Sequence, residues 1–249
     1  LHPASLLVIT EIITAAWNDE EIPAAWSVAN MLALYKKNNP REPKNYRLIF
    51  VEEHFSKLFQ KVLVQHLDDH FESFAPEFSN GFRRARGCTD ALFILKETLR
   101  KRKEHGLHSW LLFLDITAAF DRVPRDLLWW SLSVCGVSPK LVRVLQALYT
   151  NRTGFFSIGG ASTTMTVDGG TCQGALLAPR LFSYYMYVIL EIYLSDNAAG
   201  LLRMTVEQNR DAAPSTGAGT ASTSTATAIS DAASARSLFL GLFNVADDT

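Results

Sequence analysis

The hydrophobic pattern divides the chain into segments with a helical period and segments with a strand period. Apolar residues that recur every three or four positions predict helices. These helices span residues 6–17, 52–71, 90–103, 124–134, 139–149 and 176–194. Shorter apolar or alternating runs predict strands, the first two paired with each other and the fourth and fifth forming a hairpin. These strands are 28–35, 46–51, 110–116, 155–158, 163–167 and 237–246.

One segment near the carboxyl end has no such pattern. Residues 211–236 are almost wholly Ala, Ser, Thr and Gly, with no aromatic residue and a single Ile. A segment of this composition cannot bury enough apolar surface to offset the entropy of ordering it. We therefore expect a disordered, Ala/Ser/Thr-rich insertion over residues 197–236, after which residues 237–246 resume the character of a strand.

Composition and charge limit the class of protein only broadly. The 249 residues are 48 % hydrophobic and 20 % charged, which is typical of a globular chain with a real core. The net charge of -1 gives no overall attraction to nucleic acid, although residues 82–103 are rich in Lys and Arg. That stretch is either a surface that faces phosphates or a solvated helix face beside a loop.

Nothing in the sequence indicates secretion or a membrane span. The three cysteines are scattered without metal-binding spacing, which favours a reducing compartment. The first residues lack the ordered blocks of a signal peptide. The most apolar stretch, 181–190, is too short to cross a bilayer. We expect a nuclear or cytoplasmic protein that is not secreted and does not contact the membrane.

The candidate chemistry begins with carboxylates at the ends of two apolar runs. Asp115 ends the run 110–116, and the pair Asp247 and Asp248 ends the run 237–246. An ionised group beside a buried strand needs a partner or a metal to offset its desolvation. Three carboxylates that converge from two strands would bind hard divalent cations. Turn or capping roles remain the alternative for each acid taken alone.

A glycine-bearing loop, 169–182, lies between these acids in the sequence. Glycine lets the backbone approach a ligand closely, and the amide of Gln173 can bond a base or a sugar. The alternative is an ordinary loop that caps the following helix. The order of an Asp segment, a Gln-Gly loop and an Asp-Asp segment is much more specific than any of the three alone.

These segments together resemble the reverse transcriptase family, in particular enzymes of non-LTR retrotransposons and group II introns. Residues 115–121 resemble its motif A, residues 170–182 its motif B, and residues 245–248 its motif C. Upstream, residues 34–49 resemble the fingers segment with a Lys followed by Asn-Tyr-Arg, and Gly-Phe-Arg at 81–83 resembles the segment near the template. The resemblance covers residues 17–248.

The resemblance implies a catalytic metal site. Asp115, Asp247 and Asp248 would be the catalytic carboxylates and would hold two Mg²⁺ ions, with Mn²⁺ as an alternative. The carbonyl of Ile116 would be a further metal ligand. Such ions suit in-line nucleotidyl transfer to a primer 3′-hydroxyl.

The resemblance also implies the residues that bind substrates. Phe120 corresponds to a steric gate that selects deoxynucleotides, although core packing is a second role for the same ring. Lys37 is a close alternative to Lys36 as the phosphate-binding lysine. The nucleotide-binding residues would be Lys36, Arg47, Phe120, Gln173 and Gly174, and the template-binding residues would be Gly81, Phe82 and Arg83.

The fold class that follows is α+β, a right-hand polymerase palm with a small antiparallel sheet backed by helices. Fingers would occupy 1–105, the palm with motifs A and B 106–196, the insertion 197–236, and the truncated motif C strand 237–249. The thumb and other domains would belong to a longer polyprotein. Asp115 and Asp247 would lie on adjacent strands.

The leading functional hypothesis is RNA-directed DNA synthesis, with an RNA template, a DNA primer and dNTPs as partners. An alternative is a catalytically inactive relic that retains the fold and binds nucleic acid weakly. Substitutions in the motifs, such as Val245 before Ala-Asp-Asp and Leu48 in place of Pro, favour this alternative. An RNA-copying RNA polymerase is disfavoured by Phe120, because such enzymes commonly have an acid there.

Overall fold

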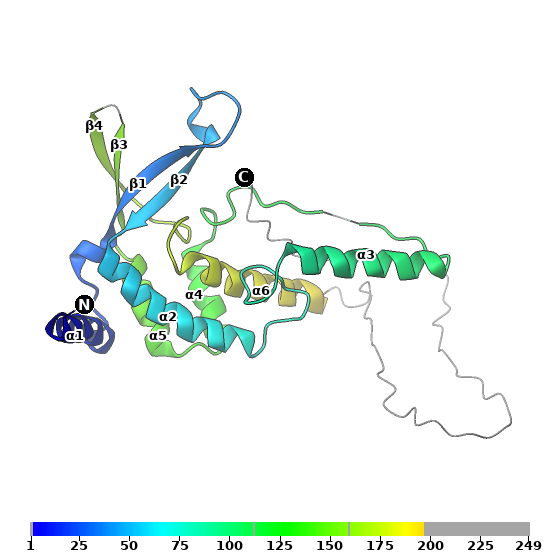
Figure 1. The fold of residues 1–249 in the computed structure, drawn as a ribbon, viewed down its shortest axis with the longest axis horizontal. Coiled ribbons are helices and arrows are strands. Elements are labelled where there is room, and N and C mark those ends of the chain that lie inside the picture. Colours follow the sequence, from blue (N-terminus) through cyan, green and yellow to red (C-terminus); the bar gives the residue numbers. More distant parts are fainter. Residues whose placement is uncertain (1, 112, 159, 197–249) are drawn as a thin grey trace, which may run out of the picture.

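A computed structural model describes residues 2–111, 113–158 and 160–196 of the chain (Figure 1). The insertion expected at 197–236 and the strand expected at 237–246 therefore lie outside the described residues. Asp247 and Asp248 lie outside them too.

The sheet consists of two hairpins joined side by side. Strand β1 (Val28–Tyr35) pairs antiparallel with β2 (Tyr46–Glu52), and β3 (Thr153–Ile158) pairs antiparallel with β4 (Ala161–Thr166). Both hairpins match the sequence prediction. The strand order is β2-β1-β3-β4, and β1 and β3 run parallel. This parallel contact joins segments far apart in the sequence, and the hydrophobic pattern did not predict it.

The helices follow the predicted pattern to within a few residues at each end. Glu53 precedes one of them and accepts hydrogen bonds from Phe55 N and Ser56 N, which satisfies amide groups that the first turn leaves free. Ser138 caps another helix in the same way through Leu141 N. The helices are α1 (Pro3–Asp19), α2 (His54–Glu72), α3 (Cys88–Glu104), α4 (Arg125–Val134), α5 (Pro139–Tyr149) and α6 (Ala178–Asp196). Two short 3₁₀ helices, Ala24–Ser27 and Pro43–Asn45, precede β1 and β2.

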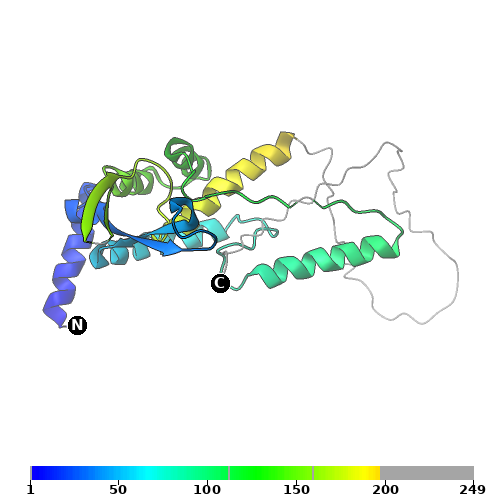
Figure 2. The same cartoon turned by 90° about the horizontal axis from the view of Figure 1, so that it is seen from above.

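The hydrophobic core lies where α2, α4, α5 and α6 pack together at one end of the sheet (Figure 1). Its fully buried side chains come from each of these helices. They include Phe59, Leu63, Leu67, Phe71, Leu128, Leu132, Leu145, Leu148, Leu181 and Tyr184. In both views α3 extends away from this body, and the segment that follows it runs back alongside (Figures 1 and 2). The core therefore supports the base of the sheet, and α3 stands apart from it.

The prediction of a buried strand at 110–116 is wrong in the part of the chain that the structure describes. This segment has no strand assignment, and Trp110, Phe113 and Leu114 are 78 %, 69 % and 70 % exposed. A strand forms only where a neighbour takes up its backbone N–H and C=O groups. The neighbour expected from the sequence, 237–246, lies outside the described residues. The described side chains of this run are exposed, and no described strand carries Asp115.

Candidate active site

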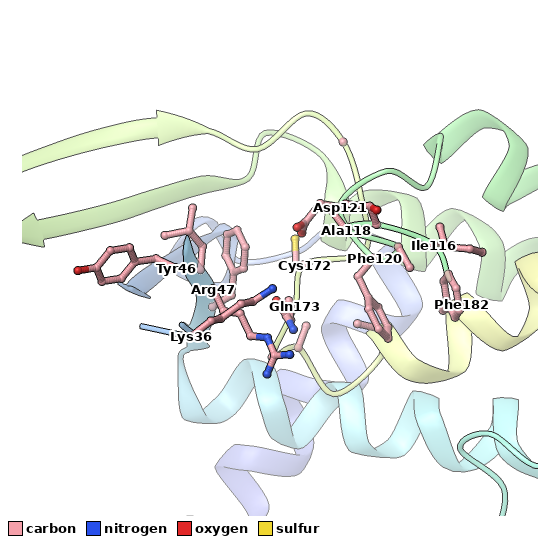
Figure 3. Close-up of a pocket in the computed structure, with 18 of the residues that line it drawn as sticks. Lys36, Tyr46, Arg47, Ile116, Ala118, Phe120, Asp121, Cys172, Gln173 and Phe182 are labelled. Atoms are coloured by element: carbon pink, nitrogen blue, oxygen red, sulfur yellow. The ribbon is translucent and has the colours of Figure 1, made fainter. Parts of the chain in front are cut away.

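A cleft of about 1980 Å³ lies between the first hairpin, the segment 113–121 and the loop before α6 (Figure 3). Most of the residues singled out from the sequence line it, although they come from four separate segments of the chain. They are Lys36, Arg47, Phe82, Asp115, Ile116, Phe120, Gln173 and Gly174. Gly81 and Arg83 do not line it. The folded chain thus brings the candidate residues of motif A, motif B and the fingers to one cavity.

The loop that carries Gln173 is held on two sides by backbone hydrogen bonds. On one side Phe50 N of β2 donates to Gln173 O at 2.9 Å. On the other side Thr171 N donates to Phe120 O at 2.9 Å. Gly174 adopts φ +99°, and a Cβ there would lie 2.8 Å from Ile49 Cγ2. Only glycine fits this backbone without strain, so the loop and the fingers hairpin approach closely because residue 174 has no side chain.

A second glycine brings the same loop against the motif A turn. Gly170 has φ +71°, and a Cβ there would lie 2.7 Å from Phe120 O and 2.8 Å from Asp121 Cα. Its amide donates to Val123 O at 3.2 Å. The two glycines therefore allow one loop to connect the fingers hairpin with the motif A turn.

Phe120 forms part of an aromatic wall of the cleft. Its ring centroid lies 4.8 Å from that of Phe182 on α6 and 6.0 Å from that of Phe82. Phe182 is buried, whereas Phe82 and Phe120 are half-buried. The ring of Phe120 thus packs against the core on one side and lines the cavity, which is the dual placement considered from the sequence.

The candidate phosphate-binding residues lie on the fingers hairpin. Lys36 directly follows β1, and its amide donates to Asn45 O at 2.9 Å. Arg47 lies on β2, paired in register with Leu34. Lys36 and Arg47 both line the cleft, but Lys37 does not. Lys37 lies in the bend that follows the strand, so the structure places Lys36 at the cleft and Lys37 outside its lining.

The acidic residues of motif A occupy the wall opposite the hairpin. Asp115 and Ile116 lie in the exposed extended segment, and Asp121 follows the turn. Desolvation raises the pKa of Asp121, and the positive charge of Lys36 partly offsets this. Within the described ranges no three His, Cys, Asp or Glu side chains are grouped closely enough to hold a metal. Convergence of Asp115 with Asp247 and Asp248 stays a prediction, since the latter two lie outside those ranges.

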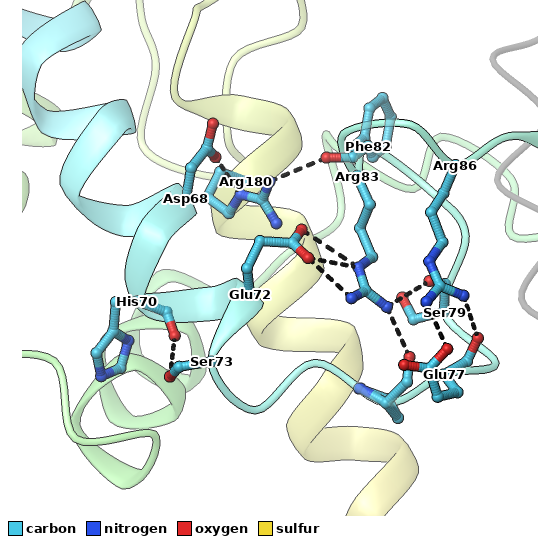
Figure 4. A network of polar contacts seen from close by, with 11 residues as sticks. Asp68, His70, Glu72, Ser73, Glu77, Ser79, Phe82, Arg83, Arg86 and Arg180 are labelled. Carbon is cyan, nitrogen blue, oxygen red and sulfur yellow. Dashed lines mark hydrogen bonds and ion pairs between the residues drawn. The ribbon is translucent and has the colours of Figure 1, made fainter.

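Arg83 is placed differently from the expectation of a template contact. Its Nη2 donates to Glu72 Oε2 at 2.8 Å, and its Nη1 donates to the carbonyls of Pro76 at 2.8 Å and Ser79 at 3.1 Å (Figure 4). The side chain is only 6 % exposed, and these bonds hold the pKa of Glu72 below its usual range. The guanidinium of Arg83 thus stabilises its own loop, and of the Gly-Phe-Arg segment it is Phe82 that reaches the cleft.

Sequence reasoning missed Arg125, which holds the Gln173 loop from behind. From the start of α4 it donates to Tyr149 O at 2.8 Å and to the carbonyls of Gly169 and Gly170 at 3.3 Å each. Its guanidinium carbon also lies 5.2 Å from the ring centroid of Tyr149. In the sequence this Arg is indistinguishable from a surface residue, because its acceptors are carbonyls that carry no sequence signal.

Comparison with known proteins identifies the family. Residues 35–205 match the family described as reverse transcriptase (RNA-dependent DNA polymerase). This chain belongs to that family. The match runs from the end of β1 to beyond α6 and so includes the motif A and motif B segments that line the cleft.

Curated relatives of this reverse transcriptase domain come from non-LTR retrotransposons. The chain is 27 % identical to the probable RNA-directed DNA polymerase from transposon X-element of Drosophila melanogaster, over 74 % of this chain and 20 % of the relative. It is 26 % identical to the RNA-directed DNA polymerase from mobile element jockey of the same species, over 66 % of this chain and 18 % of the relative. It is 22 % identical to the R2 Pol polyprotein of Popillia japonica, over 65 % of this chain and 23 % of that protein. The chain spans about a fifth of the length of these relatives.

A solved structure supports the same fold. Apo telomerase from Candida tropicalis, truncated from its C-terminal domain, superposes with a TM-score of 0.50 at 13 % identity. The superposition covers 75 % of this chain and 45 % of the telomerase chain. The α+β architecture described above is therefore consistent with a reverse transcriptase palm. None of the helices in the described residues has the length and apolarity needed to span a bilayer.

Proposed function

We propose that this reverse transcriptase domain carries the active site for RNA-templated addition of deoxynucleotides to a primer 3′-hydroxyl. The observation that supports this proposal is the cleft, which is lined by Lys36, Asp115, Phe120 and Gln173 from segments far apart in the sequence. A cavity of this size with cations on one wall and a carboxylate on another suits a nucleoside triphosphate.

The metal site of this proposal comprises Asp115, Asp247, Asp248 and the carbonyl of Ile116. Asp115 and Ile116 line the cleft, and carboxylate and carbonyl oxygens are ligands that suit Mg²⁺ and Mn²⁺. Two such ions, when bound, neutralise charge on the phosphates and lower the pKa of the primer hydroxyl. The two further aspartates lie outside the described residues, so the complete donor set belongs to the proposal.

The remaining residues would bind and orient the substrates. Lys36 and Arg47 would take the triphosphate of the incoming dNTP, since cationic donors match its charge. Phe120 would exclude a ribose 2′-hydroxyl. Gln173 and Gly174 would contact the nascent base pair, because their loop is fixed between the fingers hairpin and motif A.

An inactive relic with weak nucleic-acid binding is the second candidate. Its support is the exposure of Asp115 and of the described side chains around it, because a metal site needs rigidly held ligands. The RNA template, the DNA primer and the domains of a longer polyprotein are the partners expected of the active form. Residence in the nucleus or the cytoplasm is also part of this proposal.

Primer extension separates the two candidates. On an RNA template with dNTPs and Mg²⁺, the chain should extend a DNA primer, and Asp115→Asn should abolish extension. Asp69→Asn is the matched control, because Asp69 is exposed on α2 and does not line the cleft. Extension that persists in Asp115→Asn would contradict the mechanism. Salt-sensitive binding to primer and template without any extension would support the relic.

A further inference from the structure

Arg180 is a buried cation that connects three segments behind the cleft. It lies in the first turn of α6, and its side chain is 4 % exposed. Its Nε donates to Asp68 Oδ1 at 2.5 Å, and its Nη2 donates to Phe82 O at 3.0 Å (Figure 4). Its guanidinium carbon also lies 4.8 Å from the ring centroid of Phe71. Since Asp68 and Phe71 belong to α2, Arg180 joins α6, α2 and the loop that carries Phe82.

The residue that receives this hydrogen bond has an unusual backbone. Phe82 has φ +53°, in the left-handed region that bulky side chains rarely adopt. Such a conformation persists only where the surroundings fix it, and it is found mainly at functional sites. The bond from Arg180 to the Phe82 carbonyl is a tertiary contact that fixes this peptide. A planar guanidinium can hold the carboxylate and the carbonyl at the same time, which a lysine cannot do with the same geometry.

Two aromatic rings near Arg180 pack against the ring of Phe120. The Phe82 ring meets Phe120 edge-on, with an interplanar angle of 76°. The Phe182 ring, two residues after Arg180 on α6, packs against Phe120 at a tilt of 32°. Of these two rings, Phe82 is bonded to Arg180 through its carbonyl, and Phe182 lies two residues after Arg180 on α6.

We propose that Arg180 is a positioning residue that holds the Phe82–Phe120–Phe182 wall and thereby sets discrimination between deoxyribonucleotides and ribonucleotides. The inference rests on the proposed function, in which the Phe120 ring excludes a 2′-hydroxyl. Steric exclusion depends on the position of that ring to within a fraction of an ångström. Van der Waals interactions change strongly over such distances, so a small displacement of the ring would make room for the 2′-hydroxyl. Loss of the Arg180 bond would release Phe82 from its left-handed conformation and let Phe120 retreat.

The test measures nucleotide selectivity on the full chain. Binding of dATP and of ATP is compared on an RNA template with a chain-terminated DNA primer and Mg²⁺, so that the readout is affinity and not turnover. The dissociation constant for ATP divided by that for dATP measures the selectivity. This ratio should fall roughly tenfold in Arg180→Met, and by less in Arg180→Lys. Arg86→Met is the matched control, since Arg86 anchors the same loop through Glu77 without touching Phe82. Its ratio should stay unchanged.

A double variant isolates the coupling between Arg180 and the ring. Phe120→Ala alone should lower the ratio, and adding Arg180→Met should then lower it no further. An Arg180→Met protein that melts earlier but keeps its ratio would make the role merely structural and overturn the inference. So would an equal effect of Arg180→Met with and without Phe120. A Phe120→Ala protein with an unchanged ratio would overturn the proposed gate itself, and absence of nucleotide binding would overturn both proposals.

Discussion

The ion pair between Glu52 and Arg152 offers a direct test of how the fingers sheet is attached to the helical body. Glu52 ends β2, Arg152 precedes β3, and their side chains are 0 % and 2 % exposed. Arg152 Nη2 donates to Glu52 Oε1. Gln60 on α2 donates to Glu52 Oε2 at 2.8 Å. The perturbation is Arg152→Met, which keeps most of the side-chain volume and removes the cation.

The expected loss of stability follows from the burial of this pair. Without Arg152 the Glu52 carboxylate keeps, among the described residues, the amide of Gln60, and an uncompensated buried charge destabilises a protein by about 3–5 kcal/mol. The ring of Tyr149, 5.2 Å from the guanidinium carbon, also loses its cation. For a chain of this length the free-energy change corresponds to a melting temperature lower by about 6–20 °C. Adding Glu52→Gln to Arg152→Met removes the unpaired buried charge. The double variant should recover about 2 kcal/mol of the free energy of unfolding.

Urea denaturation followed by circular dichroism measures these free energies through the midpoint and slope of each transition. Arg143→Met is the matched control, because Arg143 makes a bidentate pair with Glu20 at 2.6 and 2.7 Å on the surface. It should lose much less stability than Arg152→Met, because exposed ion pairs are screened by solvent. The reasoning fails if Arg152→Met is no worse than this control. It also fails if the double variant shows the simple sum of the two single losses.

Three further outcomes are expected. Gly174→Ala should lower stability by about 2 kcal/mol and weaken dNTP binding, because its backbone has φ +99° and its Cβ would clash. Gly169→Ala, where a Cβ meets nothing within 4 Å, should do neither. Arg125→Met should raise the KM for dNTPs more than it lowers kcat, with partial rescue by Arg125→Lys, as steady-state kinetics would reveal. Burial raises the pKa of Cys135 to about 11, so at pH 7.5 its thiol should be alkylated much more slowly than exposed Cys88 in a mass-spectrometric time course.

The local pattern of the chain accounts for most of its elements. The alternating segment 28–35 and the helical segment 139–149 were predicted with the bounds that β1 and α5 have. The signals that predict these bounds are local: the period of the side chains, and capping or Pro residues near the ends. The order of motifs likewise identified the reverse transcriptase family, because the chemistry of each motif resides in a few adjacent residues.

Other features depend on contacts between distant segments. The parallel pairing of β1 with β3, the partners of Arg83 and Arg125, and the strained backbone of Phe82 all depend on such contacts. The run 110–116 is apolar enough for a buried strand, yet Trp110, Phe113 and Leu114 are exposed, so composition alone does not determine whether a strand forms. Amino-acid type determined by itself which segments form helices and hairpins, because these bonds close within a few residues. Only the tertiary structure decided which carbonyl accepts a bond from which arginine and which carboxylate lines the cleft. Every residue has the same backbone carbonyl, so the sequence does not mark the one that a distant arginine will contact.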